Sequence, residues 1–288
     1  MKSAAMIYLD PRDIFCRSFF CTETSQPEWE EEIPHWQSYV ECFFAANGLT
    51  LTDKQKRVSE WINSPERAAF SDMVLAILPE ARAAISPARI STVLMAHWTP
   101  DLHMGTSVVN AAIHALGLAD CLALAISDRG PDAGLFALDG LQDCLAGKNE
   151  DGLLLIAEQK NLMYHSPLMA QLQPENTACV CVVNTQQRGL RYRGYKKVPH
   201  STLSPAWLED HLIGAGLESK YTTIIGPAHV LEAIKTDFHT QAHKETLLCA
   251  APFAALKQHW QPARHYVLIS EYQGECSLST FAAAESCL

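Results

Sequence analysis

Cysteine and histidine are the residue types in this chain that most readily do chemistry, and their spacing argues against a metal site. The sequence holds 10 cysteines and 12 histidines. No two cysteines form a Cys-x-x-Cys pair, which is the spacing typical of structural zinc. His239 and His243 are four residues apart, but they lack the Glu of a His-Glu-x-x-His motif and a third ligand nearby. We therefore expect no metal, and a polar surface position for both histidines.

The cysteines are better explained as core residues than as disulfides. The first ten residues, MKSAAMIYLD, combine one Lys with a very short apolar stretch and an early Asp, so they do not resemble an export signal. Without export, thiols are expected to stay reduced. Cys179 and Cys181 alternate along a predicted strand, which places both on one packed face.

No motif for a cofactor is present. The sequence lacks a Gly-x-Gly-x-x-Gly run, a P-loop and a Gly-x-Ser-x-Gly elbow. We therefore expect no nucleotide cofactor and no serine-hydrolase chemistry.

Composition sets further limits on partners. The chain has 288 residues, of which 48% are hydrophobic and 19% charged, with a formal net charge of −10. An acidic chain is a poor ligand for phosphate backbones, so nucleic acid is not expected as a partner. No apolar run approaches the ~18 residues that a membrane helix needs. These features predict a folded cytoplasmic protein with no membrane partner.

Apolar runs and helical spacing predict an α/β architecture in the first half. Strands are expected at 4–9, 91–96, 120–126 and 152–157, and helices at 64–82, 106–116 and 131–146. Ser64-Pro65-Glu66 is a typical helix start. Strands that alternate with helices favour right-handed crossovers and a mostly parallel sheet. Residues 10–65 fit no such pattern and are predicted to be an insertion with one or two helices, whose acidic run Glu28–Glu32 is a solvated face.

The second half shows the same alternation of predicted strands and helices. Strands are expected at 177–184, 189–197, 222–225, 265–270 and 276–283, and helices at 204–213, 228–238 and 250–260. The pattern predicts two α/β halves joined near 165–175, with boundaries at 1–165 and 166–288.

Segment 93–160 resembles the thiolase superfamily, in particular its ketoacyl-ACP synthase III branch. A strand ends in Thr99-Pro100-Asp101, a small-residue helix closes on Leu116-Gly117, a further helix ends at Gly147, and the strand 153–157 is followed by Glu158. Residues 264–280 resemble the closing strand, Gly-containing loop and strand of that family. The resemblance implies a five-layer αβαβα fold of two pseudo-symmetric halves.

The resemblance also implies a Cys, a His and an Asn, and this chain has none of them at the matching positions. The Cys would accept an acyl group at a helix N-terminus, and the His and Asn would stabilise an enolate. The Cys position falls on Gly130, or on Asp128 if two residues are skipped; the His position falls on Gly226, and the Asn position on Glu245. Asp128 is expected to be a helix cap paired with Arg129, because an acyl-aspartate would hydrolyse readily. A carboxylate at 245 would repel an enolate.

Loss of all three groups implies a non-catalytic subunit that pairs with a catalytic homologue. The chain resembles the Cys-lacking subunit of heterodimeric ketosynthases, such as the alkylquinolone-forming one, through residues 134–139, 251–256 and 267–270. The expected assembly is a heterodimer or heterotetramer. An acyl carrier protein or acyl-CoA would then be engaged through the partner.

Other interpretations remain open. The chain could be an acyltransferase with a non-standard site, for which Asp128, Arg129, His229 and Cys249 are the candidate pocket residues, or a homodimeric acyl-binding protein. The basic residues between 188 and 197 are expected to form a solvated hairpin; in ketosynthases such patches receive the carrier protein or the phosphates of coenzyme A.

Overall fold

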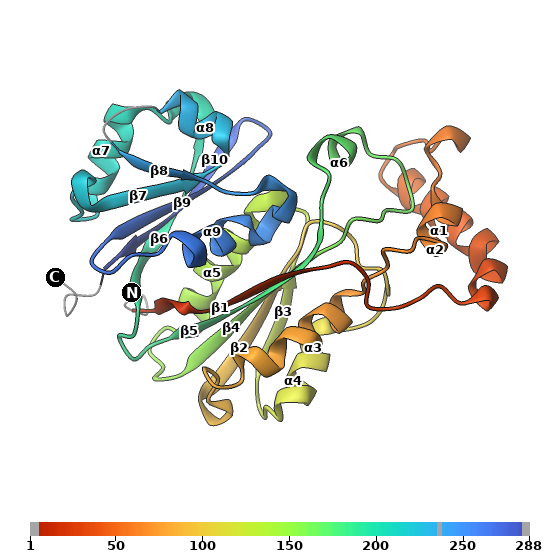
Figure 1. Ribbon diagram of the computed structural model, residues 1–288, viewed down its shortest axis with the longest axis horizontal. Helices are drawn as coiled ribbons and strands as arrows, with labels where there is room; N and C mark the ends of the chain where they lie inside the picture. The colour runs from red at the N-terminus through yellow and green to blue at the C-terminus, as the bar shows by residue number, and fades with distance from the viewer. Residues whose placement is uncertain (1–5, 235–237, 284–288) are drawn as a thin grey trace.

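Ten strands form one mixed sheet in a computed structural model that describes residues 6–234 and 238–283 (Figure 1). The strands are β1 (Tyr8–Phe19), β2 (Ile90–Ala96), β3 (Leu122–Ile126), β4 (Asp151–Glu158), β5 (Asn176–Asn184), β6 (Leu190–Pro199), β7 (Thr222–Gly226), β8 (His239–Ala242), β9 (His265–Tyr272) and β10 (Glu275–Ala282). Their order is β3-β2-β4-β5-β1-β6-β10-β9-β7-β8. The strands β3 and β8 are therefore the two edges.

The strand order contains an internal duplication. From its outer edge, the first half has the order β3-β2-β4-β5-β1. From its own outer edge, the second half has the order β8-β7-β9-β10-β6, which is the same sequence of third, second, fourth, fifth and first strand. The halves join through a short pairing of β1 with β6, where Leu9 faces Leu190. The predicted fold of two pseudo-symmetric α/β halves is confirmed, while the boundary near residue 165 stays a prediction.

The expectation of a mostly parallel sheet is wrong. The pairs β2–β3, β2–β4, β7–β8 and β7–β9 are parallel. The pairs β4–β5, β5–β1, β1–β6, β6–β10 and β10–β9 are antiparallel. A helical crossover between two strands makes those strands parallel, and this explains only the parallel pairs. The other strands of each half are joined without such a crossover, so they can pair antiparallel.

Helices form three layers around the two sheet halves (Figure 1). The helices α3 (Phe70–Ala81) and α4 (Val108–Leu116) cover the first half, and α7 (Pro205–Gly214) and α8 (Ala228–Ala233) cover the second. The helices α5 (Ala133–Cys144) and α9 (Ala251–His259) lie between the halves in the largest apolar cluster, with residues such as Leu135, Leu138 and Phe253 fully buried. Burial from both sides explains why these two helices are apolar around most of their circumference.

The helix predicted at 64–82 begins later than the sequence indicated. Ser64-Pro65-Glu66 lies in a turn, and α3 begins at Phe70. The first N–H group of α3 is hydrogen-bonded by a residue distant in the sequence: the Phe70 N–H donates to Asp101 Oδ1 at 2.9 Å. A tertiary contact thus replaces the local cap that the sequence offered.

The insertion is shorter than the predicted 10–65, because β1 continues to Phe19 instead of ending near residue 9. The strand keeps its antiparallel partner β5 along this extension, which the mixed aromatic and charged sequence did not reveal. The insertion carries α1 (Ile33–Ala46) and α2 (Val58–Ile62), which pack a small core of their own around Val40, Val58 and Trp61. Its acidic 3₁₀ turn, Pro27–Glu32, has no buried residue, as expected for a solvated face.

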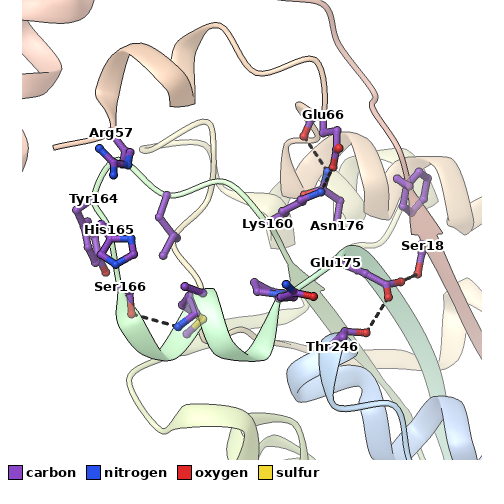
Figure 2. Close-up of a pocket in the computed structure, with 16 residues that line it drawn as sticks. Ser18, Arg57, Glu66, Lys160, Tyr164, His165, Ser166, Glu175, Asn176 and Thr246 are labelled. Atoms are coloured by element: carbon purple, nitrogen blue, oxygen red, sulfur yellow. Dashed lines mark hydrogen bonds and ion pairs between the residues drawn. The ribbon is translucent and has the colours of Figure 1, made fainter. Parts of the chain in front are cut away.

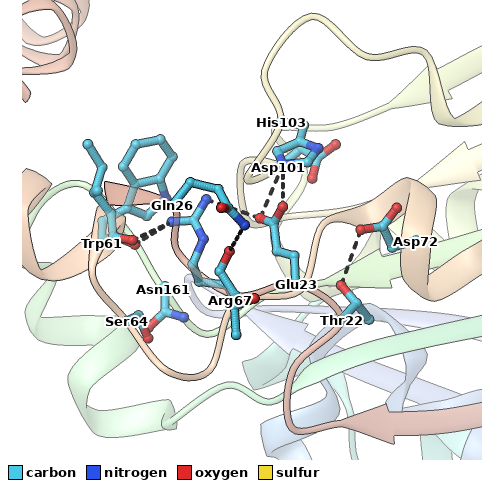
Figure 3. Close-up of polar contacts among 12 residues, drawn as sticks. Thr22, Glu23, Gln26, Trp61, Ser64, Arg67, Asp72, Asp101, His103 and Asn161 are labelled. Atoms are coloured by element: carbon cyan, nitrogen blue, oxygen red, sulfur yellow. Dashed lines mark hydrogen bonds and ion pairs between the residues drawn. The ribbon is translucent and has the colours of Figure 1, made fainter. Parts of the chain in front are cut away.

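A buried polar cluster fastens the insertion to the body (Figure 3). The Arg67 guanidinium, 3% exposed, donates to the Trp61 and Ile62 carbonyls and to Glu23. Glu23 also contacts His103 Nε2, at 3.0 Å. The cluster ties together the start of the insertion, its end and the loop that follows β2.

The expectation that every cysteine is a free thiol is wrong for one pair. Cys16 and Cys179 face each other in the β1–β5 register and form a disulfide. Cys179 and Cys181 are buried with their sulfur atoms 3.9 Å apart, which matches the predicted shared face. Strand register brought Cys16 to this face, and spacing in the sequence carries no signal of that pairing.

Two further expectations about the second half are wrong. The helix was predicted to extend from 228 to 238, but α8 ends at Ala233. Residues 235–237 of the predicted helix lie outside the described part of the chain. His239 begins the edge strand β8 instead. The basic residues lie on and beside β6, between β1 and β10, rather than on a hairpin, and several are paired: Arg188 with Asp13 and Lys197 with Glu275, each at 2.7 Å. No helix of the described chain is both long and apolar enough to cross a bilayer.

Candidate functional site between the two halves

The N-terminus of α5 meets the closing hairpin of the second half at Gly130. This residue is buried, has a φ of +69° and begins the 3₁₀ turn that leads into α5. A Cβ atom placed on it would lie 2.5 Å from Tyr272 Cδ1. The position that the resemblance gives to an acyl-accepting cysteine therefore has neither a side chain nor room for one.

An aromatic pair closes this position. The rings of Tyr272 and Trp98 meet edge to face, with centroids 4.9 Å apart. Trp98 follows β2 and Tyr272 ends β9, so each half contributes one ring. Sequence reasoning missed both residues, because nothing local in either segment indicates that they meet.

Cys249 is the thiol nearest to this turn, and its surroundings keep it protonated. It is fully buried in the 3₁₀ turn that precedes α9, and its Sγ donates to the Gly130 carbonyl at 3.4 Å. Burial raises the pKa of the Cys249 thiol well above its ordinary value, and the adjacent Glu158 carboxyl raises this pKa further. A thiol that resists ionisation and is closed to solvent is a poor nucleophile.

Glu158 is a structural clamp that explains the Thr99-Pro100-Asp101 motif. Its carboxyl accepts from the amides of Trp98 and Thr99 and from the Thr99 hydroxyl, at 2.7–2.9 Å. Complete burial raises the Glu158 pKa, and these hydrogen bonds oppose that rise. The clamp fixes the loop after β2 to the end of β4, and so fixes Trp98 in front of Tyr272.

Beside this turn lies a cavity of about 660 Å³, between the second half and the short helix α6 (Pro167–Leu172). Its walls include Trp98, Leu168, Leu172, Leu248 and Tyr272. A cavity of this size is within the range of small-molecule sites.

One histidine and two glutamates of the cavity lie close together. His229, 53% exposed, lies with Nδ1 3.8 Å from Glu245 and Nε2 3.6 Å from Glu271. The sequence placed Glu245 at the Asn position and named His229 as a pocket residue, and the fold brings the two side chains together here. Glu271 was missed because its position on the closing hairpin carries no motif.

A second histidine of the cavity corrects the sequence analysis. His243 was expected on the surface, yet it lines this cavity and its Nε2 lies 3.2 Å from the Ile269 carbonyl. Burial lowers the pKa of His243 to about 4. His239, four residues earlier, is exposed on β8 as expected. Within the described residues, no three acidic, Cys or His side chains are grouped as metal ligands.

The other predicted pocket residues lie outside this cavity. Asp128 is exposed in the turn after β3 and lines a smaller apolar cavity of about 190 Å³ beside α1. Arg129 stacks 3.7 Å from the centre of the Phe136 ring, and its Nε lies 3.5 Å from Asp132 rather than beside Asp128. Gly226 is buried, and its carbonyl accepts from the His243 amide at 3.0 Å.

A further cavity of about 600 Å³ lies on the opposite side of α6 (Figure 2). Its charged residues are largely paired: Lys160 contacts Glu66, and Glu175 is held by Lys244, Ser18 and Thr246.

Comparison with solved structures identifies the fold. An acyltransferase named ChlB3 superposes with a TM-score of 0.62 at 14% identity, covering 98% of this chain and 99% of that one. The priming β-ketosynthase of the R1128 polyketide pathway gives 0.62 at 12% identity, covering 99% and 98%. Germicidin synthase from Streptomyces coelicolor, a type III polyketide synthase, gives 0.63 at 13% identity, covering 97% and 100%.

The chain has the thiolase-like fold. These similarities run over nearly the whole length of each protein. At 11–15% identity they establish architecture alone. No family model and no curated protein matches the sequence.

Proposed function

We propose that this chain is a non-catalytic, ketosynthase III-like subunit that pairs with a catalytic homologue in the biosynthesis of a fatty-acid-derived or specialised metabolite. The observation that carries the proposal is Gly130 beneath Tyr272. A condensing enzyme of this fold needs a nucleophile at the turn into the central helix, and here an aromatic ring fills the space. Acyl transfer and condensation would then take place on the partner chain.

The edge strand β3 supports a pairing role. Leu122 and Leu124 are 43% and 50% exposed, and β3 has one free edge in the sheet. An apolar edge strand with unpaired backbone groups is a ready site for another strand. Pairing there would continue the sheet into a second subunit.

The test is co-expression of the chain with a homologue that carries Cys, His and Asn. The expected result is a stable complex by light scattering, with condensation activity that disappears when the homologue's cysteine is removed. A chain that stays monomeric at micromolar concentration in the presence of such a homologue would contradict the proposal.

A second candidate is an acyltransferase with a non-standard site, and it is favoured by one observation. The 660 Å³ cavity contains His229 between two carboxylates, and this arrangement suits a general base. Of the other predicted participants, Asp128 lies outside that cavity and Cys249 is closed to solvent. Acyl transfer by the isolated chain that is lost in His229→Gln would favour this candidate.

A further inference from the structure

The cavity between α6 and the second half carries uncompensated negative charge. Glu245 and Glu271 both line it, and no Lys or Arg is among its described lining residues. Among the described lining residues, His229 and His243 alone could carry a positive charge, and burial lowers the pKa of His243 to about 4, so even a charged His229 would offset only one of the two carboxylates. The cavity therefore repels an anion.

The two carboxylates keep capacity for a further partner. The His229 contacts, at 3.6 and 3.8 Å, are longer than hydrogen bonds. The Glu271 Oε1 atom accepts from the Gly274 amide at 2.8 Å, which fixes the carboxylate and leaves Oε2 facing His229. A donor that enters the cavity beside Glu271 would therefore meet a carboxylate that is already held in position.

His243 adds an acceptor that lacks a donor. The Ile269 carbonyl can only accept, so the Nε2 atom facing it must carry the proton. The Nδ1 atom is then an acceptor, and it is buried without a hydrogen-bond partner among the described residues. An unpaired buried acceptor is costly, and a ligand N–H group would satisfy it.

The remaining walls suit an organic cation rather than a metal ion. The aromatic rings of Trp98 and Tyr272 line the same cavity, together with Leu168, Leu172 and Leu248. Aromatic faces attract ammonium groups, and apolar side chains bind a hydrocarbon tail. A bare metal ion would gain nothing from these walls.

We propose that this cavity binds a small primary ammonium with an apolar tail. The ammonium would lie against Glu245 and Glu271, and the tail would lie along Trp98 and the leucines of α6. The inference deepens the proposed function by naming a ligand for the cavity of a chain that does no condensation itself. The inference rests on the proposed function in one respect: because the chain is non-catalytic, the ligand is bound and not converted.

The test measures binding of hexylammonium and of hexanoate to the full chain by calorimetry at pH 7. Hexylammonium is expected to bind at least about tenfold more tightly than hexanoate, because the two differ in the sign of the charge that meets the carboxylates. Glu271→Gln is expected to weaken hexylammonium binding by about tenfold. Glu275→Gln is the matched control, because Glu275 is exposed on the same hairpin and pairs with Lys197 outside the cavity.

Hexanoate binding as tight as hexylammonium binding, or hexylammonium binding that Glu271→Gln leaves unchanged, would overturn the inference. A thermal melt of each variant identifies loss of folding, and Glu245→Gln supplies a second charge removal should Glu271→Gln fail to fold. The experiment needs no partner chain. A chain that pairs with its homologue but binds no ammonium therefore refutes this inference alone.

Discussion

Tyr272 lies directly over Gly130, so close that a Cβ atom at position 130 would be 2.5 Å from the Tyr272 ring. The contact joins the start of the central helix α5 to the closing hairpin of the second half. The Tyr272 ring fills the space that a side chain at position 130 would need, and Tyr272 also lines the neighbouring cavity.

Substitution at this contact should not create a condensing enzyme. Gly130→Cys introduces a side chain at a φ of +69° and against a ring, so we expect destabilisation of about 1–3 kcal/mol. We expect no condensation either, because position 226 offers no imidazole and Glu245 repels an enolate. Urea unfolding and a condensation assay measure the two effects. The double variant Gly130→Cys/Tyr272→Ala relieves the clash, and activity in it near that of an ordinary condensing enzyme would show that the site assignment is wrong.

The native chain should not accept an acyl group. Cys249 is the thiol at the site, and burial keeps its pKa well above the ordinary value, so it does not ionise at neutral pH. After incubation with an acyl-CoA, mass spectrometry should show no adduct on residues 121–146 or on Cys249. Labelling of the exposed Cys42 serves as a control for reagent activity. A stoichiometric adduct on either site peptide would be incompatible with a non-catalytic role.

Charge on the free edge of β3 should prevent pairing. Leu124→Arg places a charge at a side chain that is 50% exposed in the isolated chain, so the variant should fold normally but fail to form a complex. Ala123→Arg differs, because Ala123 packs against the core beneath α3 and α4 and its substitution should unfold the chain. The matched control is Ile213→Arg, since Ile213 is 64% exposed on the far helix α7. Light scattering with the co-expressed homologue distinguishes the three, and a Leu124→Arg complex as stable as the native one would exclude β3 from the interface.

The Glu23–His103 contact should make stability depend on pH. The hydrogen bond to Glu23 raises the pKa of His103 above 6.5. Burial alone would raise the pKa of Glu23, but His103 and Arg67 outweigh it and lower this pKa below 4.5. The His103 contribution is complete below pH 6.5 and is lost as the pH rises through its raised value, while the Glu23 contribution is lost as the pH falls through its lowered value.

The contact should therefore stabilise the fold most between these limits. Urea unfolding should show a larger deficit for His103→Gln at about pH 5.5 than at about pH 9. His114→Gln, an exposed position on α4, is the control. Equal deficits at both pH values would mean that His103 acts by packing alone.

The Cys16–Cys179 disulfide should stabilise the chain. It joins β1 to β5 across a sequence separation of 163 residues, so Cys16→Ser should lower the free energy of unfolding by about 2–4 kcal/mol under oxidising conditions. Cys42→Ser, at an exposed free thiol, should have no such effect. A non-reducing digest that releases Cys16 and Cys179 on separate peptides would disprove the bond.

The α/β class and the two repeated halves could be read from the sequence, whereas the loss of the catalytic residues stays a prediction that rests on the family resemblance. The strands and helices can be recognised from local patterns, such as the apolar run at 153–157 and the small-residue helix at 106–116. Burial on one or both faces gives the apolar residues a regular spacing along the sequence. The assignment of the three catalytic positions to Gly130, Gly226 and Glu245 stays a prediction, made by counting from a recognisable strand or helix.

Which residues come into contact could be learned only from the folded chain. Tyr272 covers Gly130, Glu271 joins Glu245 around His229, Asp101 caps α3, and Cys16 reaches Cys179, in each case across a large separation along the chain. Such contacts depend on strand order, register and the packing of the two halves against each other. Those are properties of the folded sheet as a whole, and a local pattern of residues contains no record of them.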